Sequence, residues 1–232
     1  MGQSVTMPLI IEFNGLPGSG KTTIAEALKK QLEGMGYGVS TSYFKRKYHR
    51  YGKLVILNPV YWNLIKTFIK YSSFFEEKKS LSMIFRVVNF IRSYNNFIIS
   101  KRNEILMVDQ GFIQGLISLA HQDLLPQISY LDEVLKKSKI DSFNLVCVNC
   151  NVKESVSNER ISHRPMNGCR VETMGEIERM NTLKVQKDNL TYLRKRVGDL
   201  CPNILCFDIN TENDLNDNVC NIIKSISCAK CN

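Results

Sequence analysis

The feature that most constrains this chain is a glycine-rich segment ending in lysine and threonine near the start of the sequence. It runs from Gly15 to Thr22 and fits the pattern glycine, four variable residues, glycine, lysine, threonine. Glycines let the backbone curl until its N–H groups converge on one anion, the lysine reaches outer phosphate oxygens, and the threonine hydroxyl can ligate Mg²⁺. The pattern predicts a phosphate-binding loop. The predicted nucleotide-binding residues are Gly15, Pro17, Gly18, Ser19, Gly20, Lys21, Thr22 and Thr23.

The residues on either side of this loop support that interpretation over an accidental glycine-rich turn. Residues 8–13 form an apolar run typical of a buried strand, and Ile24, Ala25, Leu28 and Leu32 then recur at helical spacing. The N-terminus of a helix carries the positive end of the helix dipole, which favours a bound phosphate. We therefore expect a strand, the loop and a helix in direct succession.

Length and composition indicate one globular domain. No proline- or serine-rich linker and no internal repeat divides the 232 residues, so we expect residues 1–232 to form a single unit. The formal net charge of +9 suits nucleic acid, an anionic membrane surface or a nucleotide polyphosphate, and does not choose among them. The apolar stretch at residues 54–75 contains too many polar residues to span a bilayer.

The eight cysteines are expected to be reduced. The sequence shows no secretory signal, and a phosphate-binding loop uses cytosolic nucleotide, so we expect a cytoplasmic protein. Two C-x-x-C pairs, Cys147/Cys150 and Cys228/Cys231, are an alternative zinc site. The first pair falls on an apolar strand, where residues three apart point to opposite faces, which disfavours metal binding.

A second functional element is an apolar strand that ends in a carboxylate. Residues 105–108 are continuously apolar and Asp109 follows them. A carboxylate at the C-terminal end of a strand beside a phosphate-binding loop can hold the Mg²⁺ shell or accept a proton from an attacking hydroxyl. We predict Asp109 as a catalytic and metal-binding residue, although a lone aspartate here can also cap a turn.

A third element is a charged segment from about residue 160 to residue 172. Arg160 and Arg164 are four residues apart, so on one helix they would share a face and reach one anion together. The tip at residues 166–168 has the sequence Met-Asn-Gly, and Arg170 follows it. This arrangement predicts a lid that closes over phosphate, with a solvated helical hairpin as the alternative.

A helical region at about residues 45–102 is expected on the acceptor side. It begins with a basic cluster, residues 45–53, in which Arg46 is a candidate substrate ligand. The cluster is more consistent with a solvated loop than with a substrate contact, and least consistent with a nucleic-acid contact. Tyr61, Trp62, Ile65, Phe68 and Ile69 fit one helix face, which is a candidate core or dimer face. Arg86 and Arg92 lie on the next helix, facing solvent or substrate.

The alternation of strands and helices predicts an α/β fold. Five strand-like segments alternate with helices, which implies a three-layer P-loop NTPase fold with a five-stranded parallel sheet and a lid segment. Asn210 and Thr211 follow the last predicted strand, where an adenine would lie.

Three segments resemble the nucleoside and nucleotide kinases, and thymidylate kinase most closely. They read IIEFNGLPGSGKTTIAEAL, ILMVDQGFIQGLISLA and NERISHRPMNGCRVE, in that family's order. The resemblance implies that residues 15–22 hold the donor phosphates and that Arg160, Arg164 and Arg170 form a lid. Asp109 matches the acidic residue of the family's Asp-Arg-Tyr or Glu-Arg-Ser motif. Gln110 stands where the family has an arginine for the acceptor phosphate, and Arg46 is a candidate to compensate.

These observations together predict an ATP- and Mg²⁺-dependent phosphotransferase. The expected acceptor is a nucleoside or a nucleoside monophosphate such as thymidylate, with Gln110 and Arg170 among the substrate residues. One alternative is a kinase of a non-nucleotide metabolite. Another is a nucleotide-dependent switch or nucleic-acid-binding ATPase, which the absence of an Asn-Lys-x-Asp guanine motif weakens. We expect no membrane partner.

Overall fold

The computed structural model describes residues 8–42, 59–71, 80–100, 104–119, 128–164 and 170–229. Within these residues the chain forms a five-stranded sheet in the order β2-β3-β1-β4-β5. All neighbouring strands pair in parallel. The strands are β1 (Leu9–Gly15), β2 (Gly38–Ser42), β3 (Glu104–Val108), β4 (Leu145–Asn151) and β5 (Leu205–Asn210).

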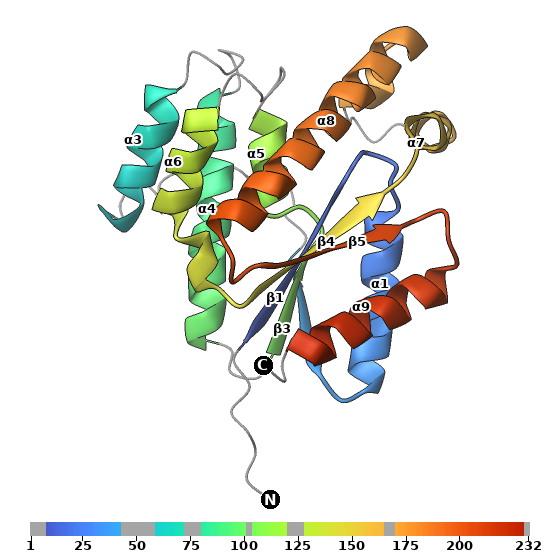
Figure 1. The fold of residues 1–232 in the computed structure, drawn as a ribbon, viewed down its shortest axis with the longest axis horizontal. Helices are drawn as coiled ribbons and strands as arrows, with labels where there is room; N and C mark the ends of the chain where they lie inside the picture. The colour runs from blue at the N-terminus through green and yellow to red at the C-terminus, as the bar shows by residue number, and fades with distance from the viewer. Residues whose placement is uncertain are drawn as a thin grey trace, which may run out of the picture.

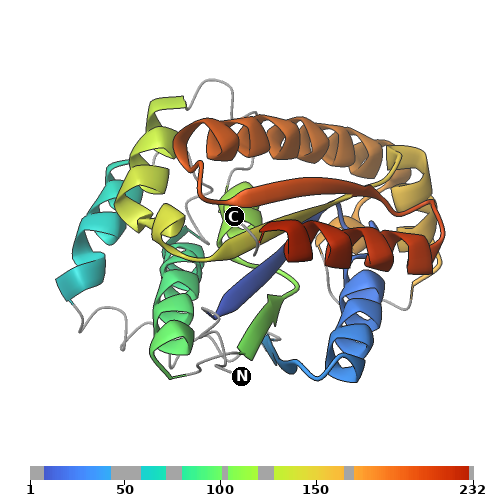
Figure 2. The same cartoon turned by 60° about the horizontal axis from the view of Figure 1, so that its bottom comes forward.

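Helices cover both faces of the sheet (Figure 1). One face packs on α1 (Lys21–Gly34) and α9 (Leu215–Ala229). The helices on the opposite face are α3 (Trp62–Lys70), α4 (Ser80–Ser100), α5 (Phe112–Leu119), α6 (Ile128–Ser138) and α8 (Glu176–Leu200). Figure 2 shows α8 and α9 on opposite sides of β5. The predicted three-layer α/β fold with a parallel sheet is confirmed.

The central strand shows why the sequence adopts this arrangement. Every residue of β1 is buried, because β3 and β4 flank it and helices cover both of its faces. Ile10 packs with the α4–α5 side, whereas Ile11 and Phe13 pack with the α1–α9 side. The same alternation sends Cys147 and Cys150 of β4 into opposite cores, so this C-x-x-C pair does not converge.

The helix α3 differs from the predicted face. Tyr61, Leu64 and Phe68 are buried, whereas Trp62 is 49% exposed and Ile69 is 50% exposed. Tyr61 ends the short 3₁₀ helix Pro59–Tyr61, and α3 begins at Trp62. Tyr61, Leu64 and Phe68 follow the i, i+3, i+7 spacing of one helix face, and Trp62 and Ile69 lie beside that face. The core stripe of this helix therefore contains Leu64, which the sequence interpretation omitted.

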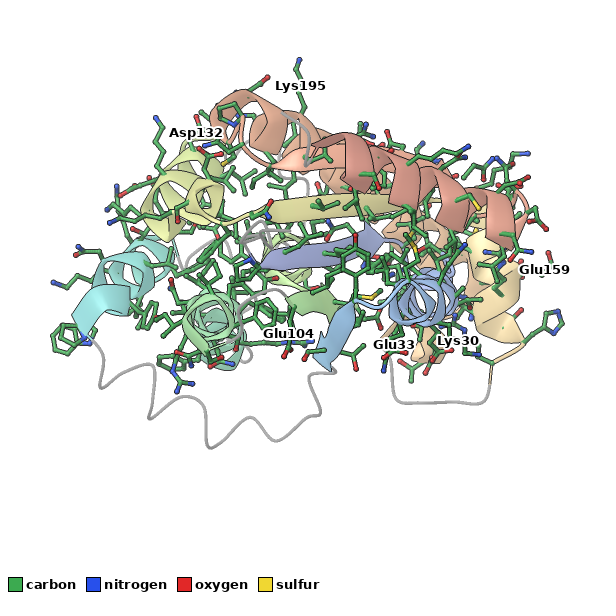
Figure 3. The ribbon with its side chains drawn as sticks, turned by 90° about the horizontal axis from the view of Figure 1, so that it is seen from below. Lys30, Glu33, Glu104, Asp132, Glu159 and Lys195 are labelled. Atoms are coloured by element: carbon green, nitrogen blue, oxygen red, sulfur yellow. The ribbon has the colours of Figure 1, made fainter. Side chains whose placement is uncertain are left out.

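Ion pairs join several helices at the outer surface. Arg196 of α8 donates to both carboxylate oxygens of Asp132 on α6, at 3.0 and 2.6 Å. Figure 3 labels Asp132 on α6, Lys195 on α8 and Glu159 on the helix α7 (Glu154–Ser162), all at the periphery of the fold. In the part of the chain that the structure describes, no helix is both long enough and apolar enough to cross a membrane.

Candidate functional site

The predicted phosphate-binding loop connects β1 to α1 at the C-terminal edge of the sheet. Gly18 and Gly20 both have φ angles of +81°, a conformation that side chains other than glycine rarely adopt. A Cβ atom at Gly18 would also lie 2.8 Å from the carbonyl oxygen of Ser157 on α7. The Ser157 hydroxyl donates a short hydrogen bond to the carbonyl oxygen of Pro17. The loop therefore packs directly against α7.

Lys21 folds back into its own loop. Its Nζ donates to the carbonyl oxygens of Gly15 at 2.9 Å and Leu16 at 2.8 Å, and to Ser19 Oγ at 3.4 Å. The side chain is buried, at 9% exposure. Its ammonium group thus reinforces the curvature of the loop and lies beside the first turn of α1, whose initial N–H groups have no preceding helical carbonyl to bond.

Thr22 and Asp109 are brought together from segments 87 residues apart. Thr22 Oγ1 donates to Asp109 Oδ2 at 3.1 Å. Among the described residues, the other carboxylate oxygen, Oδ1, is buried and has no hydrogen-bond partner. A hydroxyl and a carboxylate oxygen are hard ligands of the type that Mg²⁺ prefers. The residues present therefore fit magnesium, which Thr22 and Asp109 would hold.

Gln110 lies next to this carboxylate and contacts an arginine from α4. Arg86 Nη2 donates to Gln110 Oε1 at 3.0 Å. The Arg86 guanidinium carbon lies 6.0 Å from the centre of the Phe90 ring on the same helix. The segment after β3 has no arginine of its own, but α4 supplies a guanidinium group at this point.

Glu12 is a buried carboxyl group beneath the same segment. It is fully buried in the middle of β1 and accepts hydrogen bonds from the N–H groups of Ile113 and Gln114 and from the Tyr94 hydroxyl. Burial raises the pKa of the Glu12 carboxyl to about 7, although the hydrogen bonds that it accepts act to lower this pKa. Burial and the nearby Glu12 carboxyl also raise the pKa of Tyr94 well above its ordinary value.

The predicted lid contributes Arg160 to the loop. Arg160 Nη1 donates to the carbonyl oxygen of Gly18, and its Nη2 donates to that of Thr211 just after β5, both at 3.3 Å. Arg164 lies two residues beyond the end of α7 at Ser162, so the two arginines do not share a helix face as predicted. Both nevertheless line one cleft.

This cleft has a volume of about 520 Å³, within the range typical of small-molecule sites. It opens beside the glycine-rich loop and is bounded by α7, the segment after β5 and the start of α9. Its lining consists of Gly18, Gly20, Thr23, Ile24, Val156, Glu159, Arg160, His163, Arg164, Thr211, Asn213, Leu215 and Asn218. Thr211, which the sequence predicts to lie at the position of an adenine, is one of these lining residues.

Other predicted residues lie outside the described part of the chain. Arg46 and the basic cluster around it fall in residues 43–58, and the side chain of Arg170 is likewise not described. The zinc alternative falls partly there as well, because Cys228 and Cys231 have no described side chains. Among the described residues, no group of three or more His, Cys, Asp or Glu side chains could hold a metal ion by itself.

Sequence reasoning did not identify Glu12, Tyr94, Gln114 or Ser157 as site residues. The signal for Glu12 was present, because a carboxylate within the apolar run Ile-Ile-Glu-Phe needs a hydrogen-bonding partner. Gln114 Oε1 accepts a hydrogen bond from the N–H of Gly15 at 2.9 Å, a contact between residues 99 positions apart. No local pattern indicates such a contact.

Comparison with solved structures identifies similar folds. No protein-family model matches the sequence, and no curated protein matches it significantly. A deoxyadenosine kinase from M. mycoides with bound dATP superposes with a TM-score of 0.55 and 18% identity, covering 94% of this chain and 99% of that chain. The same kinase with the products dCMP and a flexible dCDP gives a TM-score of 0.53 and 17% identity, covering 95% of this chain and 100% of that chain.

A third structure of that kinase, with bound dCTP, gives a TM-score of 0.51 and 20% identity, over 95% of this chain and 100% of that chain. The match extends over nearly the full length of both proteins, so it concerns the whole arrangement of strands and helices rather than the glycine-rich loop alone. The chain therefore has the same fold as this deoxyadenosine kinase.

Proposed function

We propose that this protein is an ATP- and Mg²⁺-dependent phosphotransferase that phosphorylates a nucleoside or a nucleoside monophosphate. The observation that carries the proposal is the contact of Thr22 with Asp109 at 3.1 Å, which joins the glycine-rich loop to the carboxylate that ends β3. A phosphate-binding loop alone serves many nucleotide-binding proteins. A loop, an adjoining carboxylate and an arginine-lined cleft together suit phosphoryl transfer.

The donor nucleotide would lie between the loop and α7. The glycine-rich loop, Lys21 and the first turn of α1 would hold its phosphates, and the cleft beside Thr211 would take its base. Arg160 already contacts both the loop and the residue after β5, and Arg164 lines the same cleft. Both guanidinium groups are suited to charge that develops on phosphate oxygens during transfer.

The magnesium ion would be held by Thr22 and Asp109, and it would neutralise charge on the donor phosphates when bound. Asp109 Oδ1, which has no hydrogen-bond partner among the described residues, is the oxygen that remains available for this role. The carboxylate can instead accept the proton of the attacking hydroxyl. Either role places the acceptor near the end of β3.

The acceptor would lie beside Gln110 and Arg86. Their 3.0 Å hydrogen bond presents an amide and a guanidinium group together at the start of α5. A guanidinium group suits an acceptor phosphate, as in thymidylate, and the amide suits a base or a sugar hydroxyl. The deoxynucleoside kinase fold supports nucleoside-type acceptors over unrelated metabolites. Arg46 and Arg170 remain further candidates for this site.

The test is an acceptor screen. The protein is incubated with Mg-ATP and separate pools of deoxynucleosides, nucleoside monophosphates and other small hydroxyl compounds, and mass spectrometry detects any compound that gains one phosphate. We expect a product from the first or second pool that is absent with the K21M variant. Product from only the third pool would make this a metabolite kinase. Consumption of ATP without any phosphorylated acceptor would contradict the proposal and favour a nucleotide-dependent switch or ATPase.

We further propose that the protein is cytoplasmic and that its function involves neither nucleic acid nor a membrane. A homodimer built on the exposed part of α3, where Trp62 and Ile69 lie, is part of the same hypothesis. Analytical ultracentrifugation of the W62S variant beside the unmodified chain tests it, since loss of a dimer only in the variant is the expected result.

A further inference from the structure

Glu12 has no part in the phosphate-binding roles proposed above, yet it is the one carboxyl group among the described residues that is fully buried within the sheet. Its register neighbours are Val108 on β3 and Cys147 on β4. A carboxyl group in such surroundings is unfavourable unless other groups donate hydrogen bonds to it. Its partners therefore show what the side chain stabilises.

These partners lie at the start of α5, about a hundred residues away. Glu12 Oε1 accepts from the N–H groups of Ile113 at 2.8 Å and Gln114 at 3.1 Å. Tyr94 of α4 donates from its hydroxyl to Glu12 Oε2 at 3.0 Å and accepts from the N–H of Phe112 at 3.3 Å. Three consecutive N–H groups at the helix start are thus satisfied from β1 and α4, the task that a local capping side chain usually performs.

Gly111, the residue before α5, has no side chain to cap the helix, and the structure explains why. A Cβ atom there would lie 2.3 Å from both Glu12 Cδ and the Tyr94 hydroxyl oxygen. The backbone therefore passes directly against the buried carboxyl group. The path of the corner between β3 and α5, which contains Asp109 and Gln110, follows from this contact.

A second connection joins the same helix to the glycine-rich loop. Gln114 is one of the residues whose N–H groups bond Glu12, and its side-chain Oε1 accepts from the N–H of Gly15 at 2.9 Å. Gly15 is only three residues after Glu12 in the chain. The strand, the corner and the beginning of the loop consequently form a closed set of hydrogen bonds, next to the contact between Asp109 and Thr22.

We propose that Glu12 and Gln114 are positioning residues that hold the β3–α5 corner against the glycine-rich loop, so that Asp109 stays within reach of Thr22. Neither side chain touches the transferred phosphate in this arrangement. They act through the backbone of α5 and the first residue of the loop. For its kinetic readout this inference rests on the proposed phosphotransferase function, so the experiment also includes a binding readout.

The experiment compares E12Q, Q114M and S138A with the unmodified protein. E12Q keeps the size of the side chain but replaces one of its two acceptor oxygens with an NH2 donor, so the amide cannot accept both from the α5 N–H groups and from the Tyr94 hydroxyl. Q114M removes the acceptor for Gly15 from a half-buried position. Ser138 is the matched control, because it is also buried and hydrogen-bonded at a helix end. It accepts from the N–H of Ile140 and donates to the carbonyl of Leu135, ahead of β4 and therefore at the opposite edge of the sheet.

In the kinetic arm, we expect E12Q and Q114M to lower kcat by roughly tenfold to a hundredfold, because a small displacement of catalytic groups has effects of that order. The KM for ATP should change by less than about threefold, since the loop and the cleft remain. S138A should reduce thermal stability and leave kcat within about twofold of the unmodified value. Equal loss of kcat in S138A, or unchanged kcat in both site variants, would overturn the proposal.

In the binding arm, calorimetry measures how strongly Mg²⁺ tightens ATP binding. The unmodified protein and S138A should show this tightening, and E12Q and Q114M should lose most of it. If the unmodified protein binds Mg-ATP but phosphorylates no acceptor, the proposed function fails, while loss of tightening in the two variants still supports positioning. The positioning proposal is overturned if Mg²⁺ still tightens ATP binding in both E12Q and Q114M. It is also overturned if Mg²⁺ does not tighten ATP binding in the unmodified protein. If E12Q fails to fold, Q114M alone decides.

Discussion

Replacing Glu12 with glutamine is expected to remove a large pH dependence from the free energy of unfolding. Glu12 is fully buried, and its pKa is raised from 4.5 to about 7 in the folded protein. Between these two values the unfolded chain releases the proton while the folded protein retains it. The contribution of Glu12 is therefore fully present below about pH 4.5 and is lost as the pH rises through about 7.

The size of this effect follows from the two pKa values. One pKa unit corresponds to about 1.4 kcal/mol, so the rise from 4.5 to about 7 amounts to roughly 3 kcal/mol. Desolvation of the carboxylate is the largest cause, and the N–H groups of Gln114, Ile113 and Phe112 together with the Tyr94 hydroxyl oppose it. The neutral amide of glutamine has no ionisation to lose.

The assay is urea unfolding followed by circular dichroism at several pH values from about 4 to about 9, on the unmodified protein and E12Q. Other carboxylates titrate in both proteins, so the difference between the two free energies isolates Glu12. We expect the unmodified protein to lose about 3 kcal/mol relative to E12Q across this range. A difference that does not vary with pH would refute the raised pKa. A difference of the opposite sign would mean that the hydrogen bonds outweigh burial.

Further substitutions test the donor side of the site. K21M should lower turnover by roughly a hundredfold or more, measured by ADP release, while the loss of its hydrogen bonds within the loop lowers the melting temperature only modestly in thermal denaturation; near-normal turnover would contradict the role of the lysine. D109N should lower kcat and abolish the Mg²⁺ dependence of ATP binding in calorimetry, and unchanged Mg²⁺ dependence would exclude Asp109 as a ligand. R160A should raise the KM for ATP about tenfold through the loss of its contacts with the loop and Thr211, in steady-state kinetics; an unchanged KM would remove the arginine from the donor site. G18A should destabilise the protein by about 1–3 kcal/mol in urea unfolding because its φ is +81° and its Cβ would meet α7, whereas a stability equal to that of the unmodified chain would show that the loop can relax.

The parts of the site that the sequence predicted depend on short, local patterns. The glycine-rich loop, which includes Lys21 and Thr22, is one contiguous segment. Asp109 was identifiable because an apolar strand that ends in a carboxylate is also a local signal, and the parallel sheet then brings it to the loop. Periodic apolar residues likewise located the strands and most helices, because buried positions repeat regularly in both.

The parts that the sequence did not predict depend on contacts between distant segments. The roles of Glu12 and Gln114 require knowing that α5 begins against β1, which no pattern within either segment states. The separation of Arg160 from Arg164 depends on where α7 ends, and helix ends are poorly marked when no capping residue is present. The buried face of α3 was misassigned because apolar residues occur around much of this helix, so their spacing alone does not distinguish the face with Leu64 and Phe68 from the one with Trp62 and Ile69.

The most direct test of the central claim follows the phosphate itself. Phosphorus NMR of the protein with Mg-ATP and the acceptor found in the screen shows where the γ-phosphate goes. We expect ADP and a phosphate ester of the acceptor to accumulate in equal amounts, and neither to form with K21M. Accumulation of ADP with inorganic phosphate in place of the ester would contradict phosphoryl transfer to a small acceptor.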